Sequence, residues 1–131
     1  MTDSGAGQGF YPQQTPIDAY GNSGFRFAGI SHRGSLLCLP TGMHGWPVVA
    51  PAEITAESFA RVFETADEID VLLIGQGTDI APFDRTLRQS LRERGIIVEA
   101  ISTGSAVRTY NVLLAEERRV AAALIAIENA K

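Results

Sequence analysis

The strongest constraint on the fold is residues 102–127, where two different apolar patterns follow one another. Between residues 106 and 115, apolar side chains recur at the helical period and gather on one side, with Arg108 and Asn111 on the other. Residues 120–127 are all apolar. The first pattern predicts an amphipathic helix, whereas the second predicts a segment that is buried all round.

Four charges at residues 116–119 (Glu-Glu-Arg-Arg) separate the two patterns and predict a turn. Alanine is frequent after this quartet, so one continuous helix over residues 103–128 is the alternative. A short apolar run does not distinguish a buried strand from a buried helix by periodicity. Because the two halves differ in periodicity, we predict that residues 120–127 form a central, buried strand.

The composition is that of one soluble globular domain, with 131 residues, 45% hydrophobic and 20% charged. A net charge of -4 implies no overall attraction to nucleic acid or to an anionic membrane, and neither partner is predicted. Cys38 is the single cysteine, which fits a reducing compartment. The chain has neither a signal peptide nor the run of about 20 apolar residues of a membrane span, so the cytoplasm is the expected location.

The first half of the chain predicts mainly β-structure. Residues 1–16 are rich in Gly, Gln, Ser and Pro and are expected to be a disordered tail, followed by a single domain over residues 17–128. Residues 17–20 and 25–27 flank a Gly-Asn-Ser-Gly turn and predict a β-hairpin. Residues 29–39 continue the β-rich region.

In the second half, apolar strands at residues 71–74 and 96–101 alternate with helices. One helix is expected to open at Pro82 and to close at Gly95, and the next covers residues 105–115. Alternation of this kind predicts parallel strands with right-handed crossovers. The expected fold class is α/β, in which a β-rich N-terminal half packs with a small, mostly parallel sheet and flanking helices.

Three segments of the second half carry a family resemblance: residues 72–77 (LLIGQG), 91–99 (LRERGIIVE) and 106–116 (AVRTYNVLLAE). They resemble the Mth-type (Mth938-like) domain family of unknown function, which includes the mitochondrial complex I assembly factor 3. The resemblance covers residues 17–127 and implies a three-layer α/β fold, with no established catalytic activity or cofactor. Glu117 departs from it, because related chains commonly have glycine there.

A glycine-rich loop of Gly75, Gln76, Gly77 and Thr78 follows the strand at residues 71–74. Loops that bind dinucleotides and phosphates occupy such places. The third glycine of that motif is absent, and there is no Walker lysine. The loop is therefore either a tight turn that needs glycine dihedral angles or a binding loop for an anion or small molecule.

The second candidate group is Thr103, Gly104, Arg108 and Asn111, at the start of the next helix. Free helix amides together with an arginine can hold a carboxylate or phosphate. Both loops follow parallel strands, so they should open at the same sheet edge and could share one ligand cleft. The alternative is that Arg108 and Asn111 tie loops together structurally.

Other residues carry weaker signals. Arg85, Arg88 and Arg92 lie on one stripe of a predicted helix, and a solvated face is preferred to contact with nucleic acid or an acidic partner. Trp46, in a turn-rich stretch, is a candidate exposed anchor for a protein partner, or else it covers the edge of a core.

The single cysteine is a candidate nucleophile only in combination with His32 or His44. Cys38 lies among leucines, so we predict that it is buried and inert, because apolar surroundings disfavour the thiolate. The spacing of His, Cys and acidic residues does not match a zinc site, and no metal or cofactor is predicted.

Two classes of function remain open. The first is a non-enzymatic protein-interaction or assembly factor whose partner is another protein; respiratory-complex assembly is implied by the resemblance only. The second is a small-molecule or anion-binding domain, with or without catalysis, that uses the cleft between residues 75–78 and 103–108. No catalytic residue is assigned.

Overall fold

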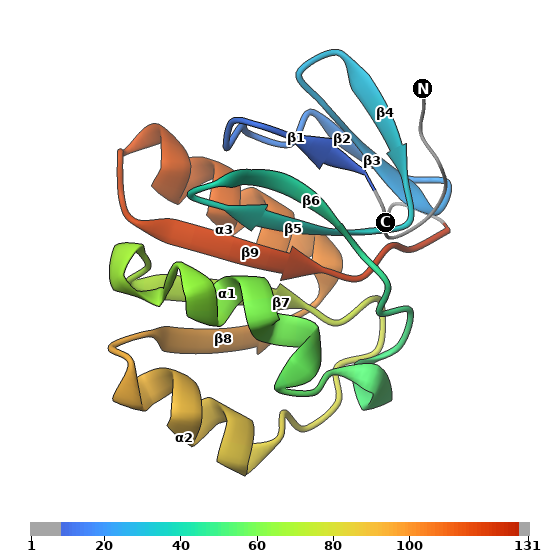
Figure 1. The fold of residues 1–131 in the computed structure, drawn as a ribbon. Helices are drawn as coiled ribbons and strands as arrows, with labels where there is room; N and C mark the ends of the chain where they lie inside the picture. The colour runs from blue at the N-terminus through green and yellow to red at the C-terminus, as the bar shows by residue number, and fades with distance from the viewer. Residues whose placement is uncertain (1–8, 129–131) are drawn as a thin grey trace.

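The computed structural model describes residues 9–128 (Figure 1). The strands are β1 (Phe10–Tyr11), β2 (Ala19–Gly21), β3 (Gly24–Phe27), β4 (Ile30–Arg33), β5 (Ser35–Leu39), β6 (Gly42–Trp46), β7 (Val71–Gly75), β8 (Ile97–Ile101) and β9 (Val120–Leu124). The α-helices are α1 (Ala60–Glu64), α2 (Arg85–Glu93) and α3 (Thr103–Ala115). Short 3-10 helices are η1 (Pro51–Glu53), η2 (Glu57–Phe59) and η3 (Ala66–Glu68).

The main sheet has six strands in the order β1-β6-β5-β9-β7-β8, and β2, β3 and β4 form a small separate sheet. Strand β9 lies inside the main sheet, and all of its residues are buried. The predicted central, buried strand is therefore confirmed, and the alternative of a continuous helix is wrong, because α3 ends at Ala115. The strand is shorter than predicted, since residues 125–127 leave the sheet after Leu124.

The parallel pairing predicted for the second half holds for β9, β7 and β8. Strands β5, β6 and β1 from the N-terminal half extend the same sheet with antiparallel pairing. The α/β class is confirmed, but the sheet is mixed rather than mostly parallel. Apolar patterning identifies strands without saying which of them pair, so the shared sheet was not apparent from the sequence.

Two layers cover the main sheet, which confirms the three-layer arrangement (Figure 1). Along β7, Leu72 and Ile74 pack on the side of α1 and α2, where they join Leu87. Leu73 faces the other side and packs with Tyr110 of α3, together with the inner face of the small sheet. The alternation follows from the two-residue period of a strand whose two faces are both buried.

The helix ends show local chemistry that the sequence predicted in part. Helix α2 begins at Arg85, and the carboxylate of Asp84 caps it by accepting a hydrogen bond from Leu87 N (2.7 Å). Pro82, the predicted opening, lies just before this cap. Gly95 follows the helix end with a φ of 87°, as a helix-terminating glycine does.

Glu117 has a φ of 62°, in the left-handed region that side chains other than glycine adopt at a cost of about 1–2 kcal/mol. The family resemblance implies glycine at this position, and the observed φ is one that glycine adopts without that cost.

The predicted hairpin is present as β2 and β3, and its turn residues Asn22 and Ser23 both have positive φ, as a type I′ turn requires. Residues 9–16 correct the predicted disordered tail. Strand β1 pairs with β6, and the side chain of Gln14 donates to Val120 O (2.8 Å). Residues 1–8 of that tail lie outside the described residues. Within residues 9–128, no helix has the length and apolar character needed to cross a bilayer.

Candidate functional site

The carboxyl ends of β7 and β8 meet at one sheet edge, as predicted. There Thr103 links the loop after β7 to the segment after β9 by hydrogen bonds. Its side chain is fully buried. The Oγ1 atom accepts from Gly77 N (2.9 Å) and donates to Ile125 O (2.7 Å), while Thr103 N donates to Gly77 O (3.0 Å). We call the set Gly75, Gln76, Gly77, Thr103 and Ile125 the Thr103 junction.

Structural constraints explain why glycine occupies both positions of this junction. A Cβ atom on Gly75 would lie 2.8 Å from Thr103 Cα, so only glycine allows the close approach. Gly77 has a φ of 87°, which favours glycine. The loop amides are also used, because Gln76 N donates to Ile101 O (2.8 Å) and Gly77 N to Thr103. These contacts match the tight-turn interpretation of the glycine-rich loop.

The start of α3 is likewise occupied by the protein itself. Ser102 caps the helix by accepting a hydrogen bond from Ser105 N (3.3 Å). Gly104 is buried, and a Cβ atom there would lie 2.6 Å from the hydroxyl of Tyr20. The phenol of Tyr20 thus packs over the helix N-terminus, which the sequence suggests as a binding site for an anion.

The structure does not bring Arg108 and Asn111 to the glycine-rich loop. Asn111 holds the N-terminal segment, since its Oδ1 accepts from Ile17 N and its Nδ2 donates to Ile17 O (both 2.8 Å). Arg108 is exposed and donates to Ser105 Oγ (3.3 Å). Asn111 therefore has the structural role that the alternative interpretation gave it, whereas Arg108 ties no loops together.

Gln76 of this junction also lines two adjacent hollows. One hollow, of about 490 Å³, lies between residues 51–56 and 82–90, and the other, of about 520 Å³, between residues 49–51, 76–79 and 125–128. Pro51 and Gln76 line both. We call the two hollows together the Gln76 groove. It contains Gln76, Gly77 and Thr78 of the predicted loop, but no residue of α3 lines it.

The side chain of Gln76 is only half satisfied. It is 2% exposed, and its Oε1 accepts a hydrogen bond from Ala81 N (3.1 Å). Within residues 9–128, its Nε2 has no hydrogen-bond acceptor. Two exposed apolar side chains accompany the groove: Val49 (67% exposed) lines it, and Ile80 (61% exposed) lies in the segment beside Ala81.

The electrostatics of the groove disfavour an anion. No Arg, Lys or His is among its described lining residues, whereas Asp79, Asp84 and Glu128 are. Asp84 is engaged as the cap of α2, but Asp79 and Glu128 are exposed. An apolar or cationic group therefore suits the groove better than a carboxylate or phosphate.

Trp46, predicted as a possible partner anchor, is 1% exposed, so that prediction is wrong. Its ring stacks on Phe59 with centroids 5.6 Å apart and planes inclined by 9°. The indole Nε1 donates to Ser58 O (2.8 Å). The turn-rich sequence suggested exposure, but η2 folds over the indole, and the alternative of a core-covering tryptophan is confirmed.

Cys38 is fully buried, as predicted, and burial raises the pKa of its thiol above the usual range. The inertness of the thiol stays a prediction. Burial also lowers the pKa of His44 to about 4, with a smaller contribution from the charge of Arg61. His44 Nε2 lies 2.8 Å from Thr41 Oγ1, and His32 Nε2 lies 2.9 Å from Ser35 O.

The arginine stripe divides into two kinds of residue. Arg85 and Arg92 are exposed, which matches a solvated face. Arg88 does not match it, because its Nη1 donates to Val98 O (2.9 Å) and its guanidinium lies 5.5 Å from the ring centroid of Phe83. Val98 belongs to β8, the last strand of the main sheet. Arg88 therefore covers a carbonyl on an open sheet edge, a common protection against edge-to-edge pairing.

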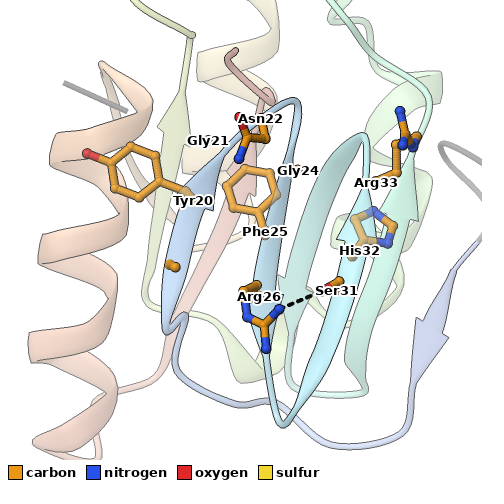
Figure 2. Close-up of a pocket in the computed structure, with 10 residues that line it drawn as sticks. Tyr20, Gly21, Asn22, Gly24, Phe25, Arg26, Ser31, His32 and Arg33 are labelled. Carbon is orange, nitrogen blue, oxygen red and sulfur yellow. Dashed lines mark hydrogen bonds between the residues drawn. The ribbon is translucent and has the colours of Figure 1, made fainter. Parts of the chain in front are cut away.

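Another hollow, of about 330 Å³, lies on the small sheet (Figure 2). Two arginines line it, but Figure 2 shows Arg26 turned toward Ser31 and Arg33 pointing away from Arg26. The bond from Arg26 Nη1 to Ser31 Oγ measures 2.8 Å. Because the guanidinium groups do not converge, this hollow lacks the geometry of an anion site.

A mixed sheet between two covering layers, with a hydrogen-bonded junction at its parallel end, defines a small three-layer α/β domain. The sequence model of the family described as protein of unknown function (DUF498/DUF598) matches residues 17–125, and the chain belongs to this family. The Mth938-like resemblance is confirmed. A solved Mth938-like domain from Bordetella pertussis has a TM-score of 0.76 and 27% identity, over 99% of this chain and 93% of that chain.

Of two further similar proteins, one is named as an outer membrane protein and the other as an assembly factor. The crystal structure of an outer membrane protein from Bartonella henselae has a TM-score of 0.86 and 52% identity, covering 90% of this chain and 99% of that chain. NADH dehydrogenase (ubiquinone) 1 alpha subcomplex assembly factor 3 of Mus musculus is 34% identical over 118 residues. That similarity covers 90% of this chain but 64% of the mouse protein, so this chain spans less than two thirds of the mouse protein's length.

Proposed function

We propose that this domain is a non-enzymatic protein-interaction module that acts as an assembly factor. The observation that carries the proposal is the 34% identity with the mouse assembly factor, which extends over 90% of the chain and so includes nearly all of its folded elements. The partner is another protein. Assembly of a respiratory complex is the specific form that the relative's name suggests, and it rests on that similarity alone.

The proposed partner surface is the Gln76 groove. Val49 exposes a large apolar side chain in this concave surface, and Ile80 exposes another in the segment beside Ala81, a combination typical of sites that dock other proteins. No basic residue is among the described residues that line the groove, and the walls of its first hollow come from residues 51–56 and 82–90. Such a surface can exclude water from a partner's apolar side chains, which is the main source of binding energy at protein interfaces.

The alternative, an anion or small molecule held between residues 75–78 and 103–108, has less support. The amides of Gln76, Gly77 and Thr103 already donate to protein oxygen atoms. A ligand would have to replace these bonds, and each buried amide left without a partner costs about 1–3 kcal/mol.

Affinity purification of the tagged chain from its native host, followed by mass spectrometry, tests the proposal. We expect the wild-type chain to retain a protein partner. Val49→Asp should lower the recovery about tenfold, because a carboxylate would have to lose its hydration in an apolar contact. Val112 of α3, which is 56% exposed and lies outside the groove, offers the matched control Val112→Asp. Recovery of a bound metabolite in place of a protein partner would contradict the proposal.

We propose the cytoplasm as the compartment, because a free and fully buried cysteine fits reducing conditions. Fractionation of the host with an antibody against the chain tests this. Recovery in the outer-membrane fraction, in keeping with the name of the Bartonella henselae protein, would overturn it.

A further inference from the structure

The fold leaves part of the hydrogen-bonding capacity of Gln76 unused. A glutamine amide has two N–H donors, and Nε2 of this buried side chain meets no acceptor among residues 9–128. A buried donor without a partner costs about 1–3 kcal/mol, so an incoming group that supplies an acceptor oxygen is favoured at this point. The bond from Ala81 N to Oε1 (3.1 Å) holds the amide in place before anything binds.

Gln76 is one of the two residues that line both hollows of the groove. The walls on either side are largely apolar: Ile54, Phe83 and Leu87 in the first hollow, and Val49, Ile125 and Ile127 in the second. An extended peptide points successive side chains to opposite sides and presents a backbone carbonyl between them. It can therefore fill both hollows and place an acceptor at Gln76, which a small apolar molecule in one hollow cannot.

The charges at the rim identify the flanks of such a segment. Asp79 and Glu128 are exposed carboxylates of the second hollow, and no basic side chain lines either hollow within the described part of the chain. A Lys or Arg beside the apolar part of a bound segment would meet complementary charge, whereas an acidic residue there would be repelled.

We propose that the Gln76 groove binds an extended segment of a partner protein. Its apolar side chains occupy the two hollows, a backbone carbonyl accepts a hydrogen bond from Gln76 Nε2, and a flanking Lys or Arg lies near Asp79 and Glu128. The proposal names the chemistry of the partner for the proposed function and rests on that function. The hydrogen bond from Ala81 N holds one end of the Gln76 amide, which lowers the cost of ordering this side chain when a partner binds.

The test uses a display library of short segments with a randomised apolar core, flanked in one half of the library by Lys and in the other half by Glu. Enriched segments are labelled with fluorescein, and their affinity for the full chain is measured by fluorescence polarisation. We expect enrichment of Lys-flanked segments. Gln76→Leu should weaken their binding by about 2- to 10-fold, the value of one hydrogen bond.

A matched pair of variants locates the binding. Ala52 is exposed and lines the first hollow, so Ala52→Phe should fill that hollow and weaken binding by about tenfold or more. Ala60 is exposed on α1 outside the groove, and Ala60→Phe should leave the affinity unchanged. Thermal unfolding of each variant verifies that it folds. If Ala52→Phe does not fold, Val49→Asp replaces it.

Three outcomes would overturn the inference: no enriched segment, enrichment of Glu-flanked segments, or binding that survives both Ala52→Phe and Val49→Asp. A negative result of the library and a negative result of the affinity purification have different consequences. If the native chain retains a protein partner and the library yields no segment, the proposed function stands and this inference is wrong. If the chain retains no partner and the library yields groove-binding segments, the groove chemistry stands without the assembly function.

Discussion

The Thr103 junction and the Gln76 groove lie at the same edge of the main sheet, and the fold treats their two buried polar residues in opposite ways. Thr103 uses both its donor and its acceptor within the protein. Gln76 uses its acceptor, while its donor has no partner within the described residues. The glycine-rich loop and the helix N-terminus beside it therefore have a structural role here. The adjoining groove is the part of this edge that can still donate a hydrogen bond to a partner.

The largest effect should come from breaking the junction with Thr103→Val, which keeps the side-chain shape and removes the hydroxyl. Gly77 N and Ile125 O would both lose a buried partner, at about 1–3 kcal/mol each. We expect the free energy of unfolding to fall by about 2–5 kcal/mol, measured by urea denaturation. Thr109→Val, at an exposed position of the same helix, is the control and should change it by less than about 0.5 kcal/mol. A loss below about 1 kcal/mol for Thr103→Val would mean that the junction is not a closed structural unit.

The second prediction compares two residues of α3 that the sequence grouped together. Asn111→Ala removes both hydrogen bonds to the backbone of Ile17 and should lower the free energy of unfolding by about 1–3 kcal/mol. Arg108→Ala should change it by less than about 0.5 kcal/mol, because the guanidinium is exposed and, among the described residues, bonds only to the hydroxyl of Ser105. Both values come from the same denaturation experiment. Equal losses for the two variants would restore Arg108 as a structural residue.

The third prediction concerns Gln76→Leu, for which two opposing effects should leave a small net change in stability. This variant loses the bond from Ala81 N, but it also removes a buried donor that has no partner within residues 9–128. The two effects oppose each other, so the free energy of unfolding should stay within about 1 kcal/mol of the wild-type value. A loss as large as that of Thr103→Val would show that Gln76 is a structural residue, and the comparison between junction and groove would fail.

The local elements and the family could be predicted from the amino-acid sequence. The 3.6-residue period before Ala115 predicted α3, and the change of periodicity after the charged quartet at residues 116–119 predicted the buried strand β9. Asn22 and Ser23 marked the hairpin turn, and Gly95 marked the end of α2. These signals are readable because they arise from dihedral preferences and side-chain spacing within a few residues. The meeting of the two loops at one sheet edge was also predictable, since it follows from parallel strand direction.

The pairing of these elements and the hydrogen bonding of their polar groups depend on contacts between distant parts of the chain. Thr103 finds its partners in Gly77 and Ile125, 26 and 22 residues away along the chain. Strand β5 joins β9 in antiparallel pairing, and this places strands of both halves in one sheet. The burial of Trp46, and the lack of an acceptor for Gln76 Nε2 within residues 9–128, likewise depend on segments that approach from elsewhere. Periodicity describes the faces of one element, whereas hydrogen-bond satisfaction depends on the geometry of several elements brought together.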